Sequence, residues 1–231
     1  MNIALIVAGG SGSRMQSDRR KQYLELGGEP VVVRTLRVFD TSVLIDRIVL
    51  VVPGDDQVFC REELLAGSGL AKPVELVAGG ETRQASVFNG LQAIDAVEDD
   101  LVVIHDAVRP FLRHSELAAC IETAGRKGAC ILALKAFDTL KQTAPDGRIE
   151  TTLDREAVWL AQTPQVFNFG QILAAHTRAH RTGVTATDDA ALAEQAGQPV
   201  IIAPGSRLNI KITTPEDLTL ASAIASFFQP D

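Results

Sequence analysis

Short aliphatic runs recur along the chain without the strict polar–apolar alternation that a half-exposed strand would show. Runs of this kind are typical of strands that are covered on both faces of a sheet. They occupy Ile3–Val7, Ile48–Val52, Val74–Val77, Leu101–Ile104, Ala129–Leu134 and Val200–Ala203. Helix-like segments lie between them, at Val31–Phe39, Val58–Leu65, Thr82–Ile94, Ser115–Arg126 and Asp188–Gln195. This order predicts an α/β fold in which a mostly parallel sheet carries helices on both faces.

One stretch breaks the alternation of strands and helices. Asp138–Thr143 and Ile149–Asp154 have the pattern of two strands, and the Pro and Gly between them favour a turn. We therefore expect a hairpin arm at about residues 136–158 that leaves the sheet. An isolated hairpin is only marginally stable in water, so the arm is expected to pack on a second copy in a homodimer. The alternative is an arm folded back on its own domain.

Composition and charge narrow the classes of protein that fit. The chain has 231 residues, of which 46% are hydrophobic, which is enough for a single core and predicts one domain over residues 1–231. Lys and Arg number 22 against 29 for Asp and Glu, which gives a net charge of −7. This charge argues against broad contact with nucleic acid or with anionic membranes. An anionic ligand must then be held by cations that cluster locally.

The cysteines and the two ends of the chain bear on its location. Cys60, Cys120 and Cys130 are odd in number and lack the spacing of a metal site, which favours a reducing compartment and a cytoplasmic protein. The apolar start, Met1–Ala8, is too short for a membrane span or a signal peptide and fits a buried strand. The tail after Ser226 is a possible junction, so the sequence leaves open whether the chain is complete or the first domain of a bifunctional protein.

A glycine-rich loop, Ala8-Gly9-Gly10-Ser11-Gly12-Ser13-Arg14-Met15, follows the first predicted strand and leads to Lys21. Glycines let the backbone amides approach phosphate oxygens, while Arg14 and Lys21 add positive charge. The loop is not a P-loop, because it lacks a Gly-Lys-Ser/Thr ending, and Met15 stands where a dinucleotide fingerprint needs its third glycine. The pattern thus predicts phosphate binding of another kind.

This loop, followed by Lys21-Gln22, resembles the signature of nucleotidyltransferases with a Rossmann-like fold. Later motifs narrow the resemblance: Gly79-Gly80-Glu81-Thr82-Arg83-Gln84-Ala85-Ser86-Val87, His105-Asp106-Ala107-Val108-Arg109-Pro110, Thr163-Pro164-Gln165, Thr187-Asp188-Asp189-Ala190 and Asn209-Ile210-Lys211-Ile212-Thr213. Together they are similar to the 2-C-methyl-D-erythritol 4-phosphate cytidylyltransferases, over essentially the whole chain. The resemblance implies a Rossmann-like sheet with a protruding arm for dimerisation. It also implies that CTP and 2-C-methyl-D-erythritol 4-phosphate are joined, with release of pyrophosphate, in non-mevalonate isoprenoid precursor synthesis.

The resemblance also implies roles for individual residues. Arg14 and Lys21 would hold the triphosphate and the leaving pyrophosphate, while Lys211 would approach the α-phosphate; these three are the expected catalytic residues. CTP would be bound by Ala8, Gly9, Gly10, Ser11, Gly12, Gly80, Glu81, Ser86 and Asp106. The acceptor would be bound by Asp106, Arg109, Thr139, Arg155, Thr163 and Thr187. Thr139 and Arg155 flank the arm, so they would act in the site of the neighbouring subunit.

Three further expectations concern the metal, a histidine and a departure from the family. No His, Cys or carboxylate cluster has the spacing of a protein metal cage, so Mg2+ is expected on the CTP oxygens with few protein ligands. His105 is interpreted as structural, because an ionised acceptor phosphate needs no general base. The family commonly has Pro where this chain has Arg20, and the adjacent Arg19, Arg20 and Lys21 leave open which cation enters the site.

Two other readings remain. The nearest is a cytidylyltransferase for ribitol 5-phosphate or another polyol phosphate, because the CTP half of such an enzyme would look alike. The other is a non-catalytic nucleotide-binding regulatory protein on the same fold. The joint presence of Arg14, Lys21 and Lys211 argues against it, since binding alone does not require a cation at the α-phosphate.

Overall fold

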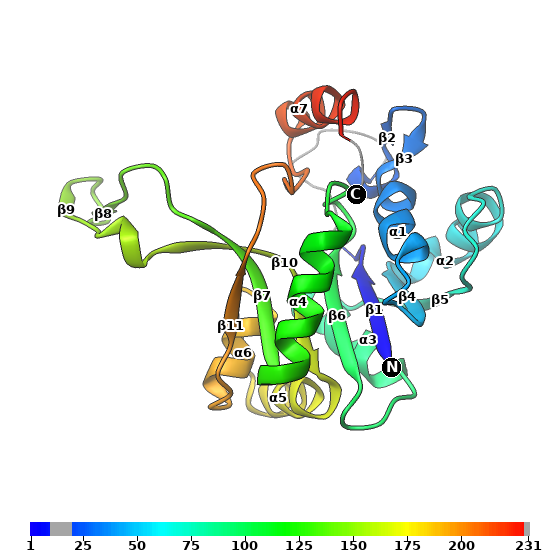
Figure 1. Cartoon of the computed structure of the whole chain (residues 1–231), viewed down its shortest axis with the longest axis horizontal. Helices are drawn as coiled ribbons and strands as arrows, with labels where there is room; N and C mark the ends of the chain where they lie inside the picture. Colours follow the sequence, from blue (N-terminus) through cyan, green and yellow to red (C-terminus); the bar gives the residue numbers. More distant parts are fainter. Residues whose placement is uncertain (10–19, 229–231) are drawn as a thin grey trace.

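The computed structural model describes residues 1–9 and 20–228, and within these residues a seven-stranded sheet forms the centre of the molecule (Figure 1). The strand order is β11-β7-β10-β6-β1-β4-β5. Their bounds are β1 Asn2–Val7, β4 Arg47–Val52, β5 Val74–Ala78, β6 Leu101–Asp106, β7 Ala129–Lys135, β10 Trp159–Asn168 and β11 Ile201–Pro204. β10 runs antiparallel to β6 and β7, and the other pairings are parallel. The predicted α/β fold with a mostly parallel sheet is confirmed.

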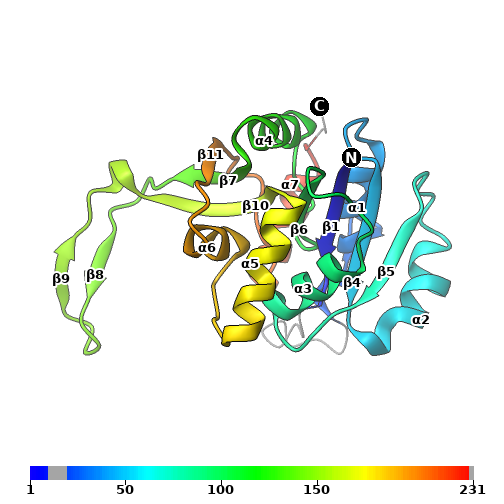
Figure 2. The same cartoon turned by 90° about the horizontal axis from the view of Figure 1, so that it is seen from below.

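Helices cover both faces of this sheet (Figure 2). One face packs on α1 Val31–Thr41, α4 His114–Lys127 and the π-helix η3 Cys60–Leu65 that continues α2 Gln57–Phe59; the other packs on α3 Arg83–Ala93, α5 Phe169–Thr182 and α6 Asp189–Gln195. Consecutive residues of β1 therefore enter different cores, and residues 3–6 are all fully buried. Burial on both sides explains why β1 lacks polar alternation. None of the helices formed by residues 1–9 and 20–228 combines the length and apolar character that crossing a membrane requires.

A smaller apolar cluster closes the edge of the sheet at the carboxyl ends of its parallel strands. It joins the ribbon β2 Glu25–Leu26 and β3 Glu29–Pro30 to α7 Pro215–Ala225. Leu26, Phe111 and Ile212 are fully buried in it. Figure 1 shows α7 and this ribbon together at the top of the molecule. The last helix is thereby anchored beside the segment that carries residue 211.

Strand β10 was not predicted. Its sequence has a polar centre, Gln162-Thr163-Pro164-Gln165, and Pro is normally excluded from central strands because it donates no ladder hydrogen bond. In the structure the register between β10 and β7 shifts between Ala161 and Gln165. This irregularity lets a Pro-containing segment lie between β6 and β7. It also aims polar side chains of a central strand at the site described below.

Two helices were also absent from the prediction. The buried residues of α5 follow helical spacing at Phe169, Ile172, Ala175 and Ala179, although two of them are only alanine. Helix α7 had a clearer signal: the Thr214 side chain accepts from the Asp217 amide in a capping box, and Pro215 begins the helix. A search for helix starts would have found α7, and a search for apolar residues at helical spacing would have found α5.

The predicted hairpin arm is present. β8 Lys141–Thr143 and β9 Ile149–Thr152 form a separate antiparallel pair, and every residue of both strands is exposed. Gly147 in the connecting turn has a φ of 84°, a conformation that favours glycine. Figures 1 and 2 both show this pair far out from the main sheet. The structure has two paired strands here, while the bounds of the arm and its part in dimerisation stay predictions.

Candidate active site

A cleft opens at the carboxyl ends of β1 and β6. The chain passes from β1 to β4 and β5 on one side and then returns to β6 on the other side of β1. Open α/β sheets bind their ligands where the strand order reverses in this way. The cleft has a volume of about 270 Å3. The described residues that line it are Val7, Ala8, Gly9, Lys21, Gln22, Glu81, Thr82, Arg83, Asp106, Val108 and Lys211. Segments from the start, the middle and the end of the chain thus meet in one place.

Lys21 reaches this cleft from the short 3-10 helix η1 Lys21–Tyr23. The neighbouring Gln22 is buried and its Nε2 donates to the carbonyl of Ala8 over 2.8 Å, which ties η1 to the end of the first strand. Arg20 turns to Asp56, with 3.3 Å between Nε and Oδ2. Of these two adjacent cations, it is therefore Lys21 that lines the cleft.

Part of the glycine-rich loop lies outside the described residues, namely Gly10, Ser11, Gly12 and Arg14. Their expected contacts with phosphate stay predictions. Ala8 and Gly9 are described, and both line the cleft. A Cβ on Gly9 would lie 2.6 Å from the hydroxyl oxygen of Ser86, so the close approach of these two segments requires glycine at this position.

Ser86 holds the backbone of the second glycine-containing segment, which begins at Gly79. Its side chain is fully buried; the hydroxyl accepts from the Gly80 amide at 3.1 Å and donates to the Thr82 carbonyl at 2.9 Å. A Cβ on Gly79 would lie 2.8 Å from the same oxygen. Glu81 and Thr82 line the cleft in its place. The predicted contact between Ser86 and the cytosine stays a prediction.

Asp106 is the centre of the charged floor of the cleft. It ends β6, is buried, and faces three cations. Its Oδ1 accepts from Arg83 Nε at 3.0 Å, while its Oδ2 lies 2.8 Å from Lys211 Nζ and 3.6 Å from Arg109 Nε. The sequence predicted that Asp106, Arg109 and Lys211 belong to one site, and the fold brings all three together.

These contacts determine the charge states. Burial alone would raise the pKa of Asp106, but the charges of Arg83, Lys211 and Arg109 hold it far below its ordinary value. Burial lowers the pKa of Arg109 and opposes the attraction of Asp106. For Arg83, the attraction of Asp189 and Asp106 outweighs burial and raises the pKa. Asp106 is accordingly a carboxylate at neutral pH and acts as an acceptor of hydrogen bonds.

Arg83 and its second partner were missed as site residues. Arg83 Nη1 donates to Asp189 Oδ2 at 2.9 Å, and Asp189 Oδ1 lies 3.1 Å from His176 Nε2. Asp189 and His176 are both buried. Arg83 and Asp189 lie within motifs already singled out in the sequence, but only the fold shows that these motifs touch.

Lys211 is positioned by its neighbours in the chain. The Ile212 amide donates to the Val108 carbonyl at 2.9 Å, and Arg109 Nη1 donates to the Asn209 carbonyl at 2.7 Å. Asn209 is buried and donates through Nδ2 to the Thr163 carbonyl at 2.8 Å. The segment around Lys211 is therefore fixed against the loop that follows Asp106.

His105 and Thr163 form the buried support of this loop. His105 Nε2 lies 3.0 Å from the Arg109 carbonyl, and its Nδ1 lies 3.0 Å from Thr163 Oγ1. Burial lowers the pKa of His105 to about 4, so the ring is neutral near pH 7. Because a carbonyl only accepts, Nε2 carries the proton, and the Thr163 hydroxyl donates to Nδ1 while it accepts from the Asp106 amide at 3.1 Å. Both side chains thus hold the backbone of Asp106 in place.

Comparison with known proteins agrees with this geometry. Residues 2–226 match the family model described as IspD, 2-C-methyl-D-erythritol 4-phosphate cytidylyltransferase. The chain belongs to this family. It is therefore a cytidylyltransferase, one kind of nucleotidyltransferase.

Individual relatives cover nearly the whole chain. A 2-C-methyl-D-erythritol 4-phosphate cytidylyltransferase from Syntrophus aciditrophicus (strain SB) is 49% identical over 96% of this chain and 94% of its own. The bifunctional enzyme IspD/IspF of Desulforudis audaxviator (strain MP104C) is 46% identical, and the match covers 96% of this chain but 56% of that protein. The crystal structure of 4-diphosphocytidyl-2C-methyl-D-erythritol synthase from Anaerococcus prevotii DSM 20548 aligns with a TM-score of 0.85 at 34% identity, over 97% of this chain and 96% of the other.

The remaining residues expected to bind the acceptor are not among the described residues that line the cleft of this cytidylyltransferase chain. Thr187 is exposed and stands just before Asp188, whose side chain caps α6 by accepting from the Ala191 amide at 3.0 Å. Thr139 and Arg155 are exposed in the arm, where Arg155 Nη1 donates to the Phe137 carbonyl at 2.8 Å. None of the three lines the cleft among the described residues.

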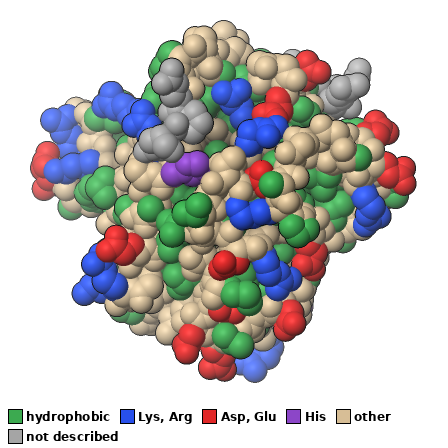
Figure 3. Space-filling model, turned by 45° about the vertical axis from the view of Figure 1, so that its right-hand side comes forward, with side chains coloured by type: hydrophobic (Ala, Val, Ile, Leu, Met, Phe, Trp, Pro, Cys, Tyr) green, Lys and Arg blue, Asp and Glu red, His purple; other side chains and the backbone are tan. Residues whose placement is uncertain are grey.

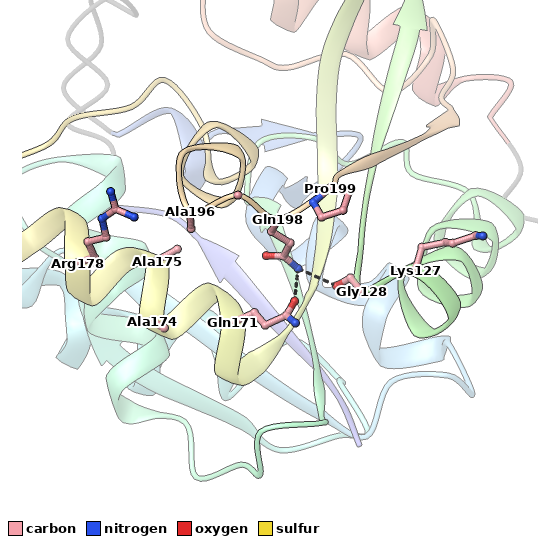
Figure 4. Close-up of a pocket in the computed structure, with 10 residues that line it drawn as sticks. Lys127, Gly128, Gln171, Ala174, Ala175, Arg178, Ala196, Gln198 and Pro199 are labelled. Carbon is pink, nitrogen blue, oxygen red and sulfur yellow. Dashed lines mark hydrogen bonds between the residues drawn. The ribbon is translucent and has the colours of Figure 1, made fainter.

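A larger hollow, of about 480 Å3, lies between α5, the end of α4 and the turn before β11 (Figure 4). Two glutamines in it pair with each other: Gln198 Nε2 donates to Gln171 Oε1 and, over 3.2 Å, to the Gly128 carbonyl. None of the motifs of the cytidylyltransferase family lines it. Its size alone does not make it a candidate active site.

The described residues of this cytidylyltransferase include no group of three or more His, Cys, Asp or Glu side chains placed to hold a metal ion. Among the described residues that line the cleft, the buried carboxylate is that of Asp106, and it is already paired with cations. The cleft suits phosphate oxygens better than it suits a bare cation.

Proposed function

We propose that the cleft lined by Lys21, Asp106 and Lys211 is where this chain transfers the cytidylyl group of CTP to 2-C-methyl-D-erythritol 4-phosphate. As a family member, the chain makes 4-diphosphocytidyl-2-C-methyl-D-erythritol and pyrophosphate in the non-mevalonate pathway. One observation carries the assignment of the site. Lysines from opposite ends of the chain line the same small cleft at the carboxyl end of the central strands.

The reaction needs charge and position more than proton transfer. An oxygen of the acceptor phosphate attacks the α-phosphorus of CTP, and the bond from that phosphorus to the bridging oxygen of pyrophosphate breaks. Lys21 and Arg14 would bind the triphosphate and the leaving pyrophosphate, while Lys211 would meet the charge that develops at the α-phosphate. The acceptor phosphate is already ionised, so no general base is required. A neutral, enclosed His105 fits this scheme.

The nucleotide would lie along the ends of β1 and β5. Close packing of Gly9 on Ser86 and of Gly80 on Ala85 leaves no room for larger side chains. The backbone around Gly80 and Glu81 would therefore approach the edge of the cytosine closely. Ser86 would hold that backbone in place and contribute to the base pocket when the nucleotide is bound.

The acceptor would be bound by two subunits. Asp106 would accept from its hydroxyls, with Arg109 and Thr163 beside it. Thr187, Thr139 and the guanidinium of Arg155 would complete its site, the last two from the arm of a partner in a homodimer. Exposed apolar side chains on and next to the arm support an arm-mediated dimer, because a partner would remove them from water: Ile149, Leu153, Trp159 and Leu160.

Mg2+ would enter on the phosphate oxygens of CTP and neutralise part of their charge. Magnesium commonly keeps several waters and binds through substrate phosphates, which suits a cleft whose carboxylate is already paired. Lys21 and Lys211 line the cleft, and their ammonium groups suit the phosphate oxygens that would carry the metal.

The charge of the chain does not favour nucleic acid or membranes as partners. The net charge is −7, and acidic and basic side chains are interspersed on the face shown in Figure 3. On that face, the described residues form no extended basic field for a phosphate backbone. A cytoplasmic location is supported by the cysteines, since Cys60, Cys120 and Cys130 are all free and buried.

A pyrophosphate-release assay tests the proposal. CTP, UTP and ATP are each combined with 2-C-methyl-D-erythritol 4-phosphate and with ribitol 5-phosphate, in the presence of Mg2+. Rapid release is expected only for CTP with the methylerythritol phosphate. Preference for ribitol 5-phosphate would reassign the acceptor, and binding of CTP without release under either acceptor would support a regulatory protein instead.

A further inference from the structure

The three cations around Asp106 are not held alike. Arg83 makes a second ion pair with Asp189 at 2.9 Å, and Arg109 donates a second hydrogen bond to the Asn209 carbonyl at 2.7 Å. Lys211 is the most exposed of the three side chains, at 37% against 27% for Arg83 and 11% for Arg109. Lys211 is thus the cation with the best access to the contents of the cleft.

Arg83 is anchored at both ends. Asp189 is only 1% exposed and is also held by His176, while Asp106 is 8% exposed. The planar guanidinium directs Nε to one carboxylate and Nη1 to the other, which a single ammonium group would not reproduce. Arg83 is therefore a fixed partner for the oxygen of Asp106 that Lys211 does not contact.

Lys211 lines the cleft, and to meet the α-phosphate most fully its ammonium group would exchange its contact with Asp106 for a phosphate oxygen. That contact is 2.8 Å long, and the carboxylate is buried, so its negative charge must keep another partner when the ammonium group moves. On the basis of the proposed function, we propose that Arg83 is a positioning residue for cytidylyl transfer. It keeps Asp106 paired through Oδ1, so that Lys211 is released from Oδ2 to the α-phosphate of CTP.

Electrostatics gives the direction of the effect. A carboxylate that has lost Arg83 would attract the remaining cations more strongly, and more of the Lys211 population would stay on Asp106. Lys211 would act mainly on charge that develops during transfer. Keeping it on Asp106 should therefore lower kcat more than it raises KM for CTP. If Arg83 had a purely structural role, its replacement would lower kcat equally whether or not residue 211 is lysine.

A double-mutant cycle separates these roles. Pyrophosphate release is measured for the wild type, Arg83→Gln, Lys211→Gln and the double variant, at saturating acceptor and varied CTP. Arg83→Gln is expected to lower kcat on the order of 10- to 100-fold when Lys211 is present. In the Lys211→Gln background the same change is expected to lower kcat by less than about twofold, since the group it releases is gone.

The controls keep the outcome decisive. Arg47→Gln removes an arginine that pairs with Glu75 at 3.0 Å at the opposite end of the sheet, and its kcat should equal that of the wild type. Should Arg83→Gln fold poorly, shown by a lowered melting temperature, the cycle is repeated with Asp189→Asn in every variant, which leaves no unpaired carboxylate at that end.

An equal loss of kcat in both backgrounds, or no loss in either, would overturn the role of Arg83. Failure of the wild type to release pyrophosphate from CTP and 2-C-methyl-D-erythritol 4-phosphate would instead refute the proposed function. The two failures are therefore distinguishable.

Discussion

The floor of the cleft and the hairpin arm use similar ion pairs in opposite surroundings. In the floor, Arg83 and Asp106 are 3.0 Å apart and the carboxylate is 8% exposed. In the arm, Arg148 and Asp146 are 2.6 Å apart, but their side chains are 82% and 55% exposed. Water screens the second pair and not the first, so a shorter distance does not mean a stronger effect.

This difference indicates how the site is divided. The half that would face CTP under the proposed function is fixed by contacts within one chain, because Asp106 is paired with cations from three separate segments. The arm lies far from its own sheet, so Thr139 and Arg155 gain a function only if a partner supplies something to contact (Figure 2). The predictions below test this division.

The largest effect is expected from Lys21→Ala. Loss of one preorganised cation should lower kcat roughly 100-fold, or about 3 kcal/mol, because the contact strengthens as charge moves to the pyrophosphate. Steady-state pyrophosphate release measures it. Lys127→Ala at the exposed end of α4 is the matched control and should keep full activity. Unchanged turnover in Lys21→Ala would remove Lys21 from the site.

Mixing two inactive variants tests the division between chains. Lys21→Ala and Arg155→Ala should each be impaired alone, one in the cleft and one in the arm. After subunit exchange, half of the dimers are mixed and each has one intact site, so activity should recover to about a quarter of that of the wild type. No recovery, with exchange verified by mass spectrometry, would show that both residues act within one chain.

Acid should lower the stability of the folded chain through protonation of His105, which supports the floor of the cleft. Its pKa of about 4 in the folded chain lies below the ordinary 6.5 of an unfolded chain, so between these values the unfolded chain binds more protons. We expect the free energy of unfolding to fall by about 2 kcal/mol from this residue between pH 7 and pH 5. Urea unfolding at both pH values measures the loss. His105→Gln should lose less over this interval; an equal loss would assign the acid sensitivity to other groups.

Arg148→Ala in the arm should have the smallest effect. Its partner Asp146 is exposed, and such pairs contribute little to stability. Neither the melting temperature nor kcat should change measurably. A clear loss of activity would mean that the tip of the arm also contacts the partner's site.

The sequence predicted the parts of the fold that depend on local pattern. β1 and β6 are buried runs, and the positions of Gly9 and Asp106 at their carboxyl ends indicated where a ligand would bind. β10 was missed because Pro164 argues against a central strand, and only the register shift against β7 accommodates it.

Contacts between distant segments could not be predicted from the sequence. Arg83 and Asp189 are 106 positions apart, and nothing in either motif indicates that the two side chains meet. The sequence also did not indicate that the Thr163 hydroxyl pairs with His105 and with the Asp106 amide, and its expected contact with the acceptor stays a prediction. Such roles depend on which side chains the packing brings within hydrogen-bond distance.

The most direct measurement is a crystal structure of the chain with CTP and Mg2+. The account predicts that the triphosphate lies in the cleft between the ends of β1 and β6. Both lysine Nζ atoms, at positions 21 and 211, should be within hydrogen-bond distance of phosphate oxygens, and Lys211 should have left Asp106 while Arg83 keeps its contact. A nucleotide bound elsewhere, or Lys211 still paired with Asp106 and remote from the α-phosphate, would contradict it.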